Sequence, residues 1–137
     1  MSSPTIVRVS DVMNREIDII DGKLTVAEAL LAMKYPHSRA LIIAKRDEND
    51  EFGLVLLSDI AKQVLAADRS PQRVNLYEIM AKPILSVLPS MDIRYCARLL
   101  ERFSIMRAPV IENGEVLGIV GYHDLVLRGL MQTIKQD

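Results

Sequence analysis

The feature that most constrains this chain is that its sequence repeats. Four blocks from the first half return in the same order in the second half, shifted by 65 to 68 residues. An internal repeat of this kind governs the architecture, because each copy is one structural unit. A unit of about 65 residues buries a limited core, so we expect the two copies to pack on each other about a pseudo-two-fold axis. The paired blocks are residues 9–13 and 76–80, 25–30 and 92–97, 39–43 and 107–111, and 53–59 and 118–124.

Composition narrows the possible partners and surroundings. The 17 basic and 18 acidic residues among 137 nearly cancel, and neither half is basic, so we expect no nucleic-acid surface. No apolar run reaches the roughly 18 residues of a membrane span, and the first residues lack the pattern of a signal peptide. Cys96 is the single cysteine, which excludes an internal disulfide and favours a reducing cytoplasm. We therefore expect a cytoplasmic protein that binds neither membranes nor nucleic acid.

Copy one, residues 1–69, predicts the order strand, helix, strand, strand, helix. Thr25 and Glu28 have the spacing of a capping box at a helix start, and Ser10 is a good N-cap for a short opening turn. Two apolar runs flank a charged turn and predict a hairpin. The expected strands are residues 17–20, 40–44 and 53–57, and the expected helices begin at Thr25 and Ser58.

Copy two, residues 74–137, repeats this order after a linker at residues 70–73. Asn113-Gly114 is a strong signal for a two-residue hairpin turn. The predicted class is therefore α+β, with tandem βαββα repeats. The expected strands are residues 84–88, 108–111 and 116–120, and the expected helices begin at Asp92 (or Ser90) and Leu125.

These blocks, in this order and present twice, resemble the cystathionine beta-synthase (CBS) domain pair, also called a Bateman module. The resemblance covers nearly the whole chain. It rests on the opening turn ending in Met, the helix starting Thr-Val, the strand Arg-Ala-Pro-Val-Ile, and Gly-Ile-Val-Gly-Tyr-His-Asp-Leu. It implies the paired fold strongly and function less so, because one fold hosts many functions. The family commonly binds adenine nucleotides or related adenosyl ligands in clefts between repeats, and thereby regulates another protein.

The ligand motif of this family runs Gly, two apolar residues, Ser or Thr, two residues, then Asp. The resemblance implies that Asp59 and Asp124 hold ribose hydroxyls. The hydroxyl that contacts phosphate is replaced by Leu56 in copy one and Gly121 in copy two. Ser58 is a possible substitute, and a helix N-terminus also offers free N–H groups to an anion. The alternative is that both Asp residues are ordinary first-turn carboxylates favoured by the helix dipole.

Copy two carries the more complete motif, so we expect its cleft to bind more readily. Gly121 leaves room at the hydroxyl position, whereas Leu56 fills it. Arg39 and Arg107 precede equivalent strands and could clamp phosphate, or could form salt bridges instead. The resemblance assigns the following residues to the binding site: Asp124, His123, Gly121, Met106, Arg107, Ala108, Pro109, Lys82, Pro83 and Ile84 for copy two, and Asp59, Ser58, Arg39 and Ala40 for copy one.

No constellation of catalytic residues is visible in the sequence. There is no phosphate-binding Gly-rich loop and no nucleophile with a base. His37 and His123 lack neighbours at metal-ligand spacing, and Cys96 falls on a buried helix face, so we expect neither metal nor cofactor. We expect a non-catalytic sensor that binds an adenosyl ligand and regulates an unknown partner. The alternative is a structural or interaction module that binds no nucleotide.

The copies also carry more apolar residues on their helices than one small body can bury. Monomers seldom leave large apolar patches exposed, so we predict a two-fold symmetric homodimer. The surplus residues are Leu31, Val64, Leu127, Leu130 and Met131.

Overall fold

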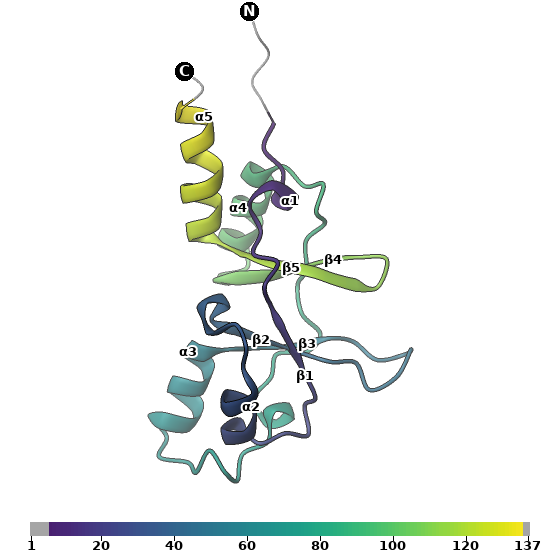
Figure 1. Ribbon diagram of the computed structural model, residues 1–137, viewed down its shortest axis with the longest axis vertical. Helices are drawn as coiled ribbons and strands as arrows, with labels where there is room; N and C mark the ends of the chain where they lie inside the picture. The colour runs from purple at the N-terminus through teal and green to yellow at the C-terminus, as the bar shows by residue number, and fades with distance from the viewer. Residues whose placement is uncertain (1–5, 136–137) are drawn as a thin grey trace, which may run out of the picture. The chain divides into compact units, whose positions relative to one another are not determined.

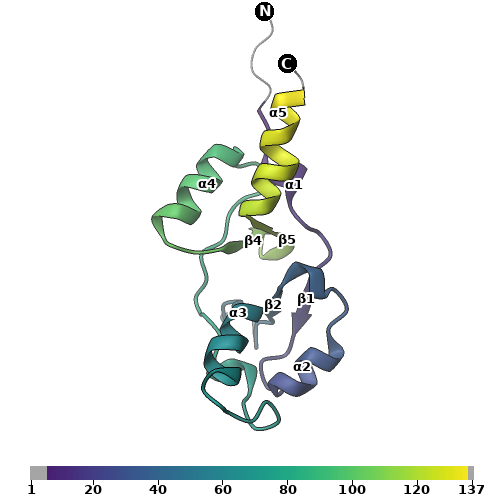
Figure 2. The ribbon, with the colours of Figure 1, turned by 90° about the vertical axis from the view of Figure 1, so that its left-hand side faces the viewer.

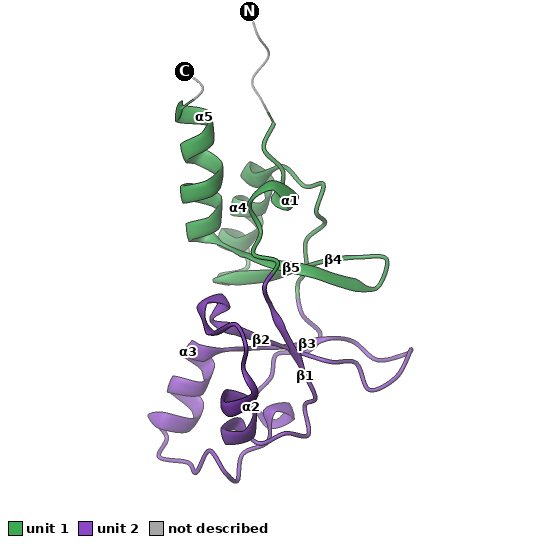
Figure 3. Cartoon of the chain, viewed as in Figure 1, with its two compact units in different colours: residues 1–15, 85–137 green, residues 16–84 purple. Residues whose placement is uncertain are grey.

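The structure is a computed structural model that describes residues 6–135 in two compact units (Figure 3). Unit 1 comprises residues 1–15 and 85–137, and unit 2 comprises residues 16–84. The units do not coincide with the sequence repeats. Residues 1–15 of copy one belong to the unit built from copy two, and residues 70–84 belong to the unit built from copy one.

This exchange of opening segments is reciprocal and is held by backbone pairing. In unit 1, Arg8 forms an isolated bridge with Asp92, the residue at the start of a helix of copy two. In unit 2, the equivalent Asn75 forms the same bridge with Thr25, the residue at the start of the matching helix of copy one. Each opening segment therefore completes the other copy's unit, through contacts between residues far apart in sequence.

Unit 2 is a three-stranded sheet with its two α-helices on one side, in the order predicted for copy one (Figures 1 and 2). Strands β1 and β2 are parallel, β2 and β3 antiparallel, and the core lies between the sheet and the helices. The elements are β1 (Asp18–Ile20), α2 (Val26–Ala32), η1 (Pro36–Ser38), β2 (Ala40–Ile43), β3 (Gly53–Leu56), α3 (Leu57–Ile60), the π-helical η2 (Ala61–Leu65) and η3 (Leu76–Glu78).

Helix α2 begins where the sequence predicts. The Thr25 hydroxyl accepts a hydrogen bond from the Glu28 backbone N–H at 3.1 Å, and the Glu28 carboxylate accepts one from the Thr25 N–H at 3.0 Å. These bonds satisfy two backbone donors that a helix start leaves unpaired, so the predicted capping box is confirmed. They also lower the pKa of Glu28, chiefly through the Thr25 backbone bond. Val26 and Ala29 on the inner face are fully buried.

Unit 1 places its helices on one side of a two-stranded hairpin (Figures 1 and 2). Asn113 and Gly114 connect the strands with φ angles of 53° and 77°, the left-handed conformations that a tight hairpin turn requires, which confirms the predicted turn. The elements are α1 (Val9–Val12), α4 (Ile93–Arg102), β4 (Arg107–Glu112), β5 (Glu115–Gly121), the π-helical η4 (Asp124–Leu130) and α5 (Met131–Lys135).

The strand predicted at residues 84–88 is wrong, because copy two keeps a single bridge there. The Val87 N–H donates to the Pro109 carbonyl at 3.0 Å, and the Ile111 N–H donates to the Val87 carbonyl at 3.0 Å. The next parallel bonds on either side would need N–H groups from Pro109 and Pro89, and proline has none. The α+β class and the two repeats are confirmed, while the βαββα order is complete in copy one alone among the described residues.

Two predicted helix caps are also wrong. Ser10 lies inside α1, whose N-cap is Arg8; the Arg8 N–H donates to the Asp11 carboxylate at 2.9 Å. Ser58 is the second residue of α3, and Leu56 is the N-cap. In both places a carboxylate three residues after the cap accepts the N–H of the cap residue itself, which is the reciprocal bond of a capping box.

Candidate functional site

The motif of copy two lies where β5 runs into the closing helix of unit 1. Residues 122 and 123 are already helical, which puts Asp124 in the first turn. Its carboxylate accepts a hydrogen bond from the Gly121 backbone N–H at 2.9 Å, and the residue is 4% exposed. The other carboxylate oxygen, Oδ1, lies 3.3 Å from Nε2 of His123, whose side chain is 53% exposed. Asp124 therefore caps the helix, with one oxygen turned toward a solvent-exposed ring.

Arg107 lies directly beside the position where the motif lacks its hydroxyl. Arg107 and Gly121 are partners in the β4–β5 register. A Cβ atom added to Gly121 would lie 3.0 Å from Cγ and 3.6 Å from Nε of Arg107. The expectation that Gly121 leaves open room is therefore wrong, because the Arg107 side chain already runs past that position. The Arg107 side chain thus lies beside Gly121, where a Ser or Thr would carry its hydroxyl.

The motif of copy one has the same backbone geometry in unit 2. The Leu56 N–H donates to the Asp59 carboxylate at 2.9 Å, as in copy two. Ala40 pairs with Leu56 across β2 and β3 and is buried. Arg39 has a left-handed φ of 60°, and Ser58 is exposed. The hydroxyl position is apolar, and both Arg39 and Ser58 lie within the same unit as Asp59.

The remaining residues assigned to the copy-two pocket are divided between the units. Met106 is exposed, while Ala108 packs in the core of unit 1 and Pro109 is buried, so the last two offer backbone atoms rather than side chains. No single unit holds the whole set, and its assembly into one pocket stays a prediction. Unit 2 holds Lys82, Pro83 and Ile84, and unit 1 holds Met106, Arg107, Ala108 and Pro109.

A pocket that the sequence did not indicate lies entirely within unit 2. Its volume is about 590 Å³, and it is formed by the turn at residues 21–23, the end of β2 with Arg46, and side chains from the segment 77–82. It adjoins the C-terminal end of β2, whereas Arg39 and Ala40 lie at the N-terminal end of that strand. Three segments from distant parts of the sequence meet here, so no local pattern could have revealed the pocket.

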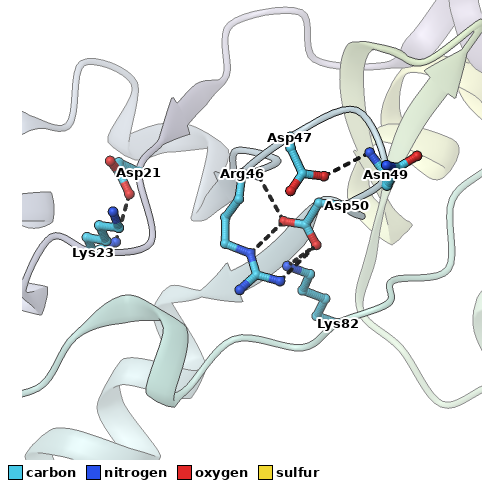
Figure 4. Close-up of polar contacts among 7 residues, drawn as sticks. All are labelled: Asp21, Lys23, Arg46, Asp47, Asn49, Asp50 and Lys82. Carbon is cyan, nitrogen blue, oxygen red and sulfur yellow. Dashed lines mark hydrogen bonds and ion pairs between the residues drawn. The ribbon is translucent and has the colours of Figure 1, made fainter.

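A charge cluster holds two of the pocket's cations in place (Figure 4). The Asp50 carboxylate accepts bonds from the Lys82 ammonium at 2.6 Å and from Nε of Arg46 at 3.1 Å. The side chains of Asp50 and Lys82 are 7% and 19% exposed. Lys82 first, and then Arg46, hold the pKa of Asp50 far below its usual range. One carboxylate thus positions two cations.

The described residues give little support to a nucleophilic cysteine, a metal site or a membrane span. Cys96 is buried, and burial raises the pKa of its thiol to about 11, as expected for a packing residue and not for a nucleophile. Within residues 6–135, no three His, Cys, Asp or Glu side chains are placed to hold a metal ion. Over the same stretch, no helix has the length and apolar character to cross a membrane.

The CBS domain model matches residues 9–66 and 76–129, which are the two repeats. The chain belongs to the CBS domain family. An uncharacterized protein of Methanopyrus kandleri is 26% identical over 135 residues, which cover 96% of this chain and 68% of that protein.

Solved structures of CBS proteins have the same fold. The hexameric CBS-CP12 protein from bloom-forming cyanobacteria is 36% identical, with a TM-score of 0.86, over 90% of this chain and 72% of that one. The CBS domain pair of protein MJ0100, solved in complex with 5′-methylthioadenosine and S-adenosyl-L-methionine, has a TM-score of 0.74 over 90% of this chain and 95% of that one. At 22% identity, that second likeness shows the fold alone.

Proposed function

We propose that this CBS protein is a non-catalytic cytoplasmic sensor, which binds an adenosyl ligand at the copy-two motif and passes its occupancy to a partner protein. The observation that carries the proposal is that Gly121 brings two groups together: its backbone N–H is bonded to Asp124, and the Arg107 side chain runs beside it through the β4–β5 register. Asp124 offers a carboxylate to ribose hydroxyls, and Arg107 offers a planar pair of donors. A ligand acts on the partner by binding two shapes of the sensor with different affinity.

The ribose would meet Oδ1 of Asp124, since Oδ2 is engaged by the Gly121 N–H. His123 contacts Oδ1 through an exposed ring, which can rotate into solvent at small cost. The same backbone bond that caps the helix also fixes the carboxylate in one orientation. Asp59 has the same cap in copy one, but its neighbour Leu56 supplies no donor, so we place the ligand in copy two.

The missing hydroxyls favour a particular kind of adenosyl ligand. In this family a Ser or Thr hydroxyl contacts phosphate, and S-adenosylmethionine and methylthioadenosine carry no phosphate. Both are bound in the MJ0100 structure. Arg107 provides the opposing argument, because a guanidinium beside Gly121 suits a phosphate. Comparing the affinities of ligands with and without a phosphate distinguishes the two possibilities.

Titration calorimetry with AMP, ADP, ATP, S-adenosylmethionine and 5′-methylthioadenosine tests the site. The Asp124→Asn variant keeps an oxygen to cap the helix but loses the charge, and we expect about tenfold to hundredfold weaker binding. Asp59→Asn is the matched control in copy one and should change affinity little. Arg107→Gln should weaken the phosphate-bearing ligands selectively. Equal affinity in wild type and Asp124→Asn would reject this site.

The second candidate is an interaction module with empty clefts, which the absence of heat with all five ligands would support. Its structural basis is apolar exposure on the helices. Leu31 of α2 is 90% exposed, and Leu127, Leu130 and Met131 of the closing helix are exposed as well. Val64, predicted to be surplus, is instead 3% exposed and part of the unit 2 core.

We retain self-association as part of either proposal. The exposed helix residues motivate a two-fold homodimer, and a hexameric relative shows that larger assemblies occur among CBS proteins. Light scattering at micromolar concentration measures the mass directly, and the mass of one chain would contradict self-association. Leu31→Asp should shift an assembly toward smaller species, because it places a charge in the apolar surface.

A further inference from the structure

The pocket in unit 2 combines an apolar floor with cations at its edge. Ile43, Ala44 and Met80 supply apolar atoms, and Tyr77 adds an exposed aromatic ring. Lys23 also lines the pocket. At about 590 Å³ the pocket lies within the usual range for small-molecule sites, which are mostly apolar with a few polar groups. This chemistry suits a ligand with a flat apolar part and an anionic group.

The residues that line the pocket favour an anion. Lys23, Arg46 and Lys82 line it together with one carboxylate, Asp21. Asp47 and Asp50 balance the remaining charge from positions outside the lining. Asp50 does not line the pocket, and it fixes Arg46 and Lys82 in position. Over the part of the chain that the structure describes, the Lys23 ammonium has no hydrogen bond or ion pair. A bound anion would meet preplaced cations rather than ordering flexible ones.

Unit 1 lacks two of these cations, Lys23 and Arg46, at the equivalent positions, while Lys82 matches Arg15; this provides an internal comparison. Residues 21–23 read Asp-Gly-Lys, while residues 88–90, which follow them by 67 positions, read Leu-Pro-Ser. The loop that carries Arg46, residues 44–52, corresponds to the shorter stretch 112–117, which contains no lysine or arginine. The repeat alone therefore does not require Lys23 or Arg46, and a core-packing role does not explain them, since both are exposed.

We propose that this unit 2 pocket is a second binding site, for a small organic anion in which a planar apolar group carries a phosphate. Tyr77 and Met80 contact the planar group, and Lys23, Arg46 and Lys82 contact the phosphate. The site shares Lys82 with the residues assigned to the copy-two pocket, but it includes neither Asp124 nor Arg107, so its test is independent of the proposed function. Because Tyr77 and Lys82 lie on the segment that leaves unit 2 after Ile84, an occupant ties that segment to the body of copy one.

Phenyl phosphate is the probe, because it combines a planar ring with a phosphate. In ¹H–¹⁵N spectra of the full chain, we expect saturable shifts at Gly22, Ala44 and Tyr77 with phenyl phosphate. Inorganic phosphate and benzyl alcohol should each bind about tenfold more weakly or worse, since each offers half of the contacts. Equal affinity for phosphate and phenyl phosphate, or shifts centred on unit 1, would overturn the proposal.

Matched variants separate the pocket from general surface charge. Lys23→Gln should weaken phenyl phosphate about three- to tenfold, whereas Lys62→Gln, which removes an exposed lysine of the same unit outside the pocket, should not. Tyr77→Leu should weaken it, and Tyr95→Leu in unit 1 is the aromatic control. Both lysine changes lie on the surface, so the fold is preserved. An unchanged affinity in Lys23→Gln would refute the assignment.

Discussion

Replacing Asp124 by Ala should destabilise the protein measurably even without ligand. The Gly121 N–H donates to this carboxylate at 2.9 Å, and both residues are buried. Ala leaves that N–H without its acceptor, which costs about 1–3 kcal/mol. Losing the charge at the helix N-terminus adds about 0.3–1 kcal/mol. We expect the free energy of unfolding to fall by about 2 kcal/mol.

Urea denaturation followed by circular dichroism measures this change. The midpoint should fall while the slope stays constant, since the substitution does not alter the surface exposed on unfolding. Asp124→Asn should lose less than half as much, because its side-chain oxygen still accepts the Gly121 bond. Asp59→Ala removes the same bond from Leu56, which is half-buried and open to water, so its cost should be about 0.5–1 kcal/mol.

The ranking of these three variants decides whether the capping argument holds. An Asp124→Ala protein within about 0.5 kcal/mol of wild type would refute it, because that is the range of ordinary surface substitutions. A larger loss for Asp59→Ala than for Asp124→Ala would show that burial of the bonded N–H does not set the cost. The Asn variant also serves as a control for the ligand experiment, because weaker binding by a well-folded Asp124→Asn protein reports on the missing charge and not on lost stability.

Three further predictions concern pH, reactivity and fragments. The contacts that lower the pKa of Asp50 stabilise the fold above the ordinary pKa of about 4, and this contribution is lost as the pH falls below that value. Asp50→Asn should therefore lose less stability than wild type between pH 7 and pH 3 in urea melts. Glu48→Gln is the control and should follow wild type. Cys96, with a thiol pKa of about 11, should react with Ellman's reagent at pH 8 only after denaturation, and fast labelling of the native protein would contradict its burial. A fragment of residues 16–84 should melt cooperatively, whereas residues 1–69 should not, because they lack the part of the unit 2 core that follows the linker.

Local sequence signals predicted the elements that depend on local bonds. Thr25 with Glu28, and Asn113 with Gly114, act through atoms within four residues of each other, so their spacing was sufficient. The predicted strand at residues 84–88 failed for a non-local reason. Its apolar character was suitable, but Pro109 in the neighbouring strand could not donate the next hydrogen bond.

The site residues show the same difference between local features, which the sequence predicted, and non-local ones, which it did not. The motif placed Asp59 and Asp124 in first helical turns, which is where they lie, since the spacing from strand to helix is local. It could not reveal that the Arg107 side chain passes over Gly121, because that contact depends on strand register. The unit 2 pocket was not predicted, because Lys23, Arg46 and Lys82 come from three separate segments; Lys82 alone had been assigned to a binding site, that of copy two.

The exchange of opening segments has a consequence for how the chain folds as it is made. Unit 2 is one unbroken stretch, and it is complete once residue 84 has been synthesised. Unit 1 must wait for its later part, and domains generally fold as units during synthesis. A folded unit 2 holds its own two ends at a fixed separation. The two parts of unit 1 can then meet without closing a flexible loop of about 70 residues, and an entropy cost of about 3–4 kcal/mol is avoided. Substitutions that slow folding of unit 2 should therefore delay unit 1 as well, although they lie outside it.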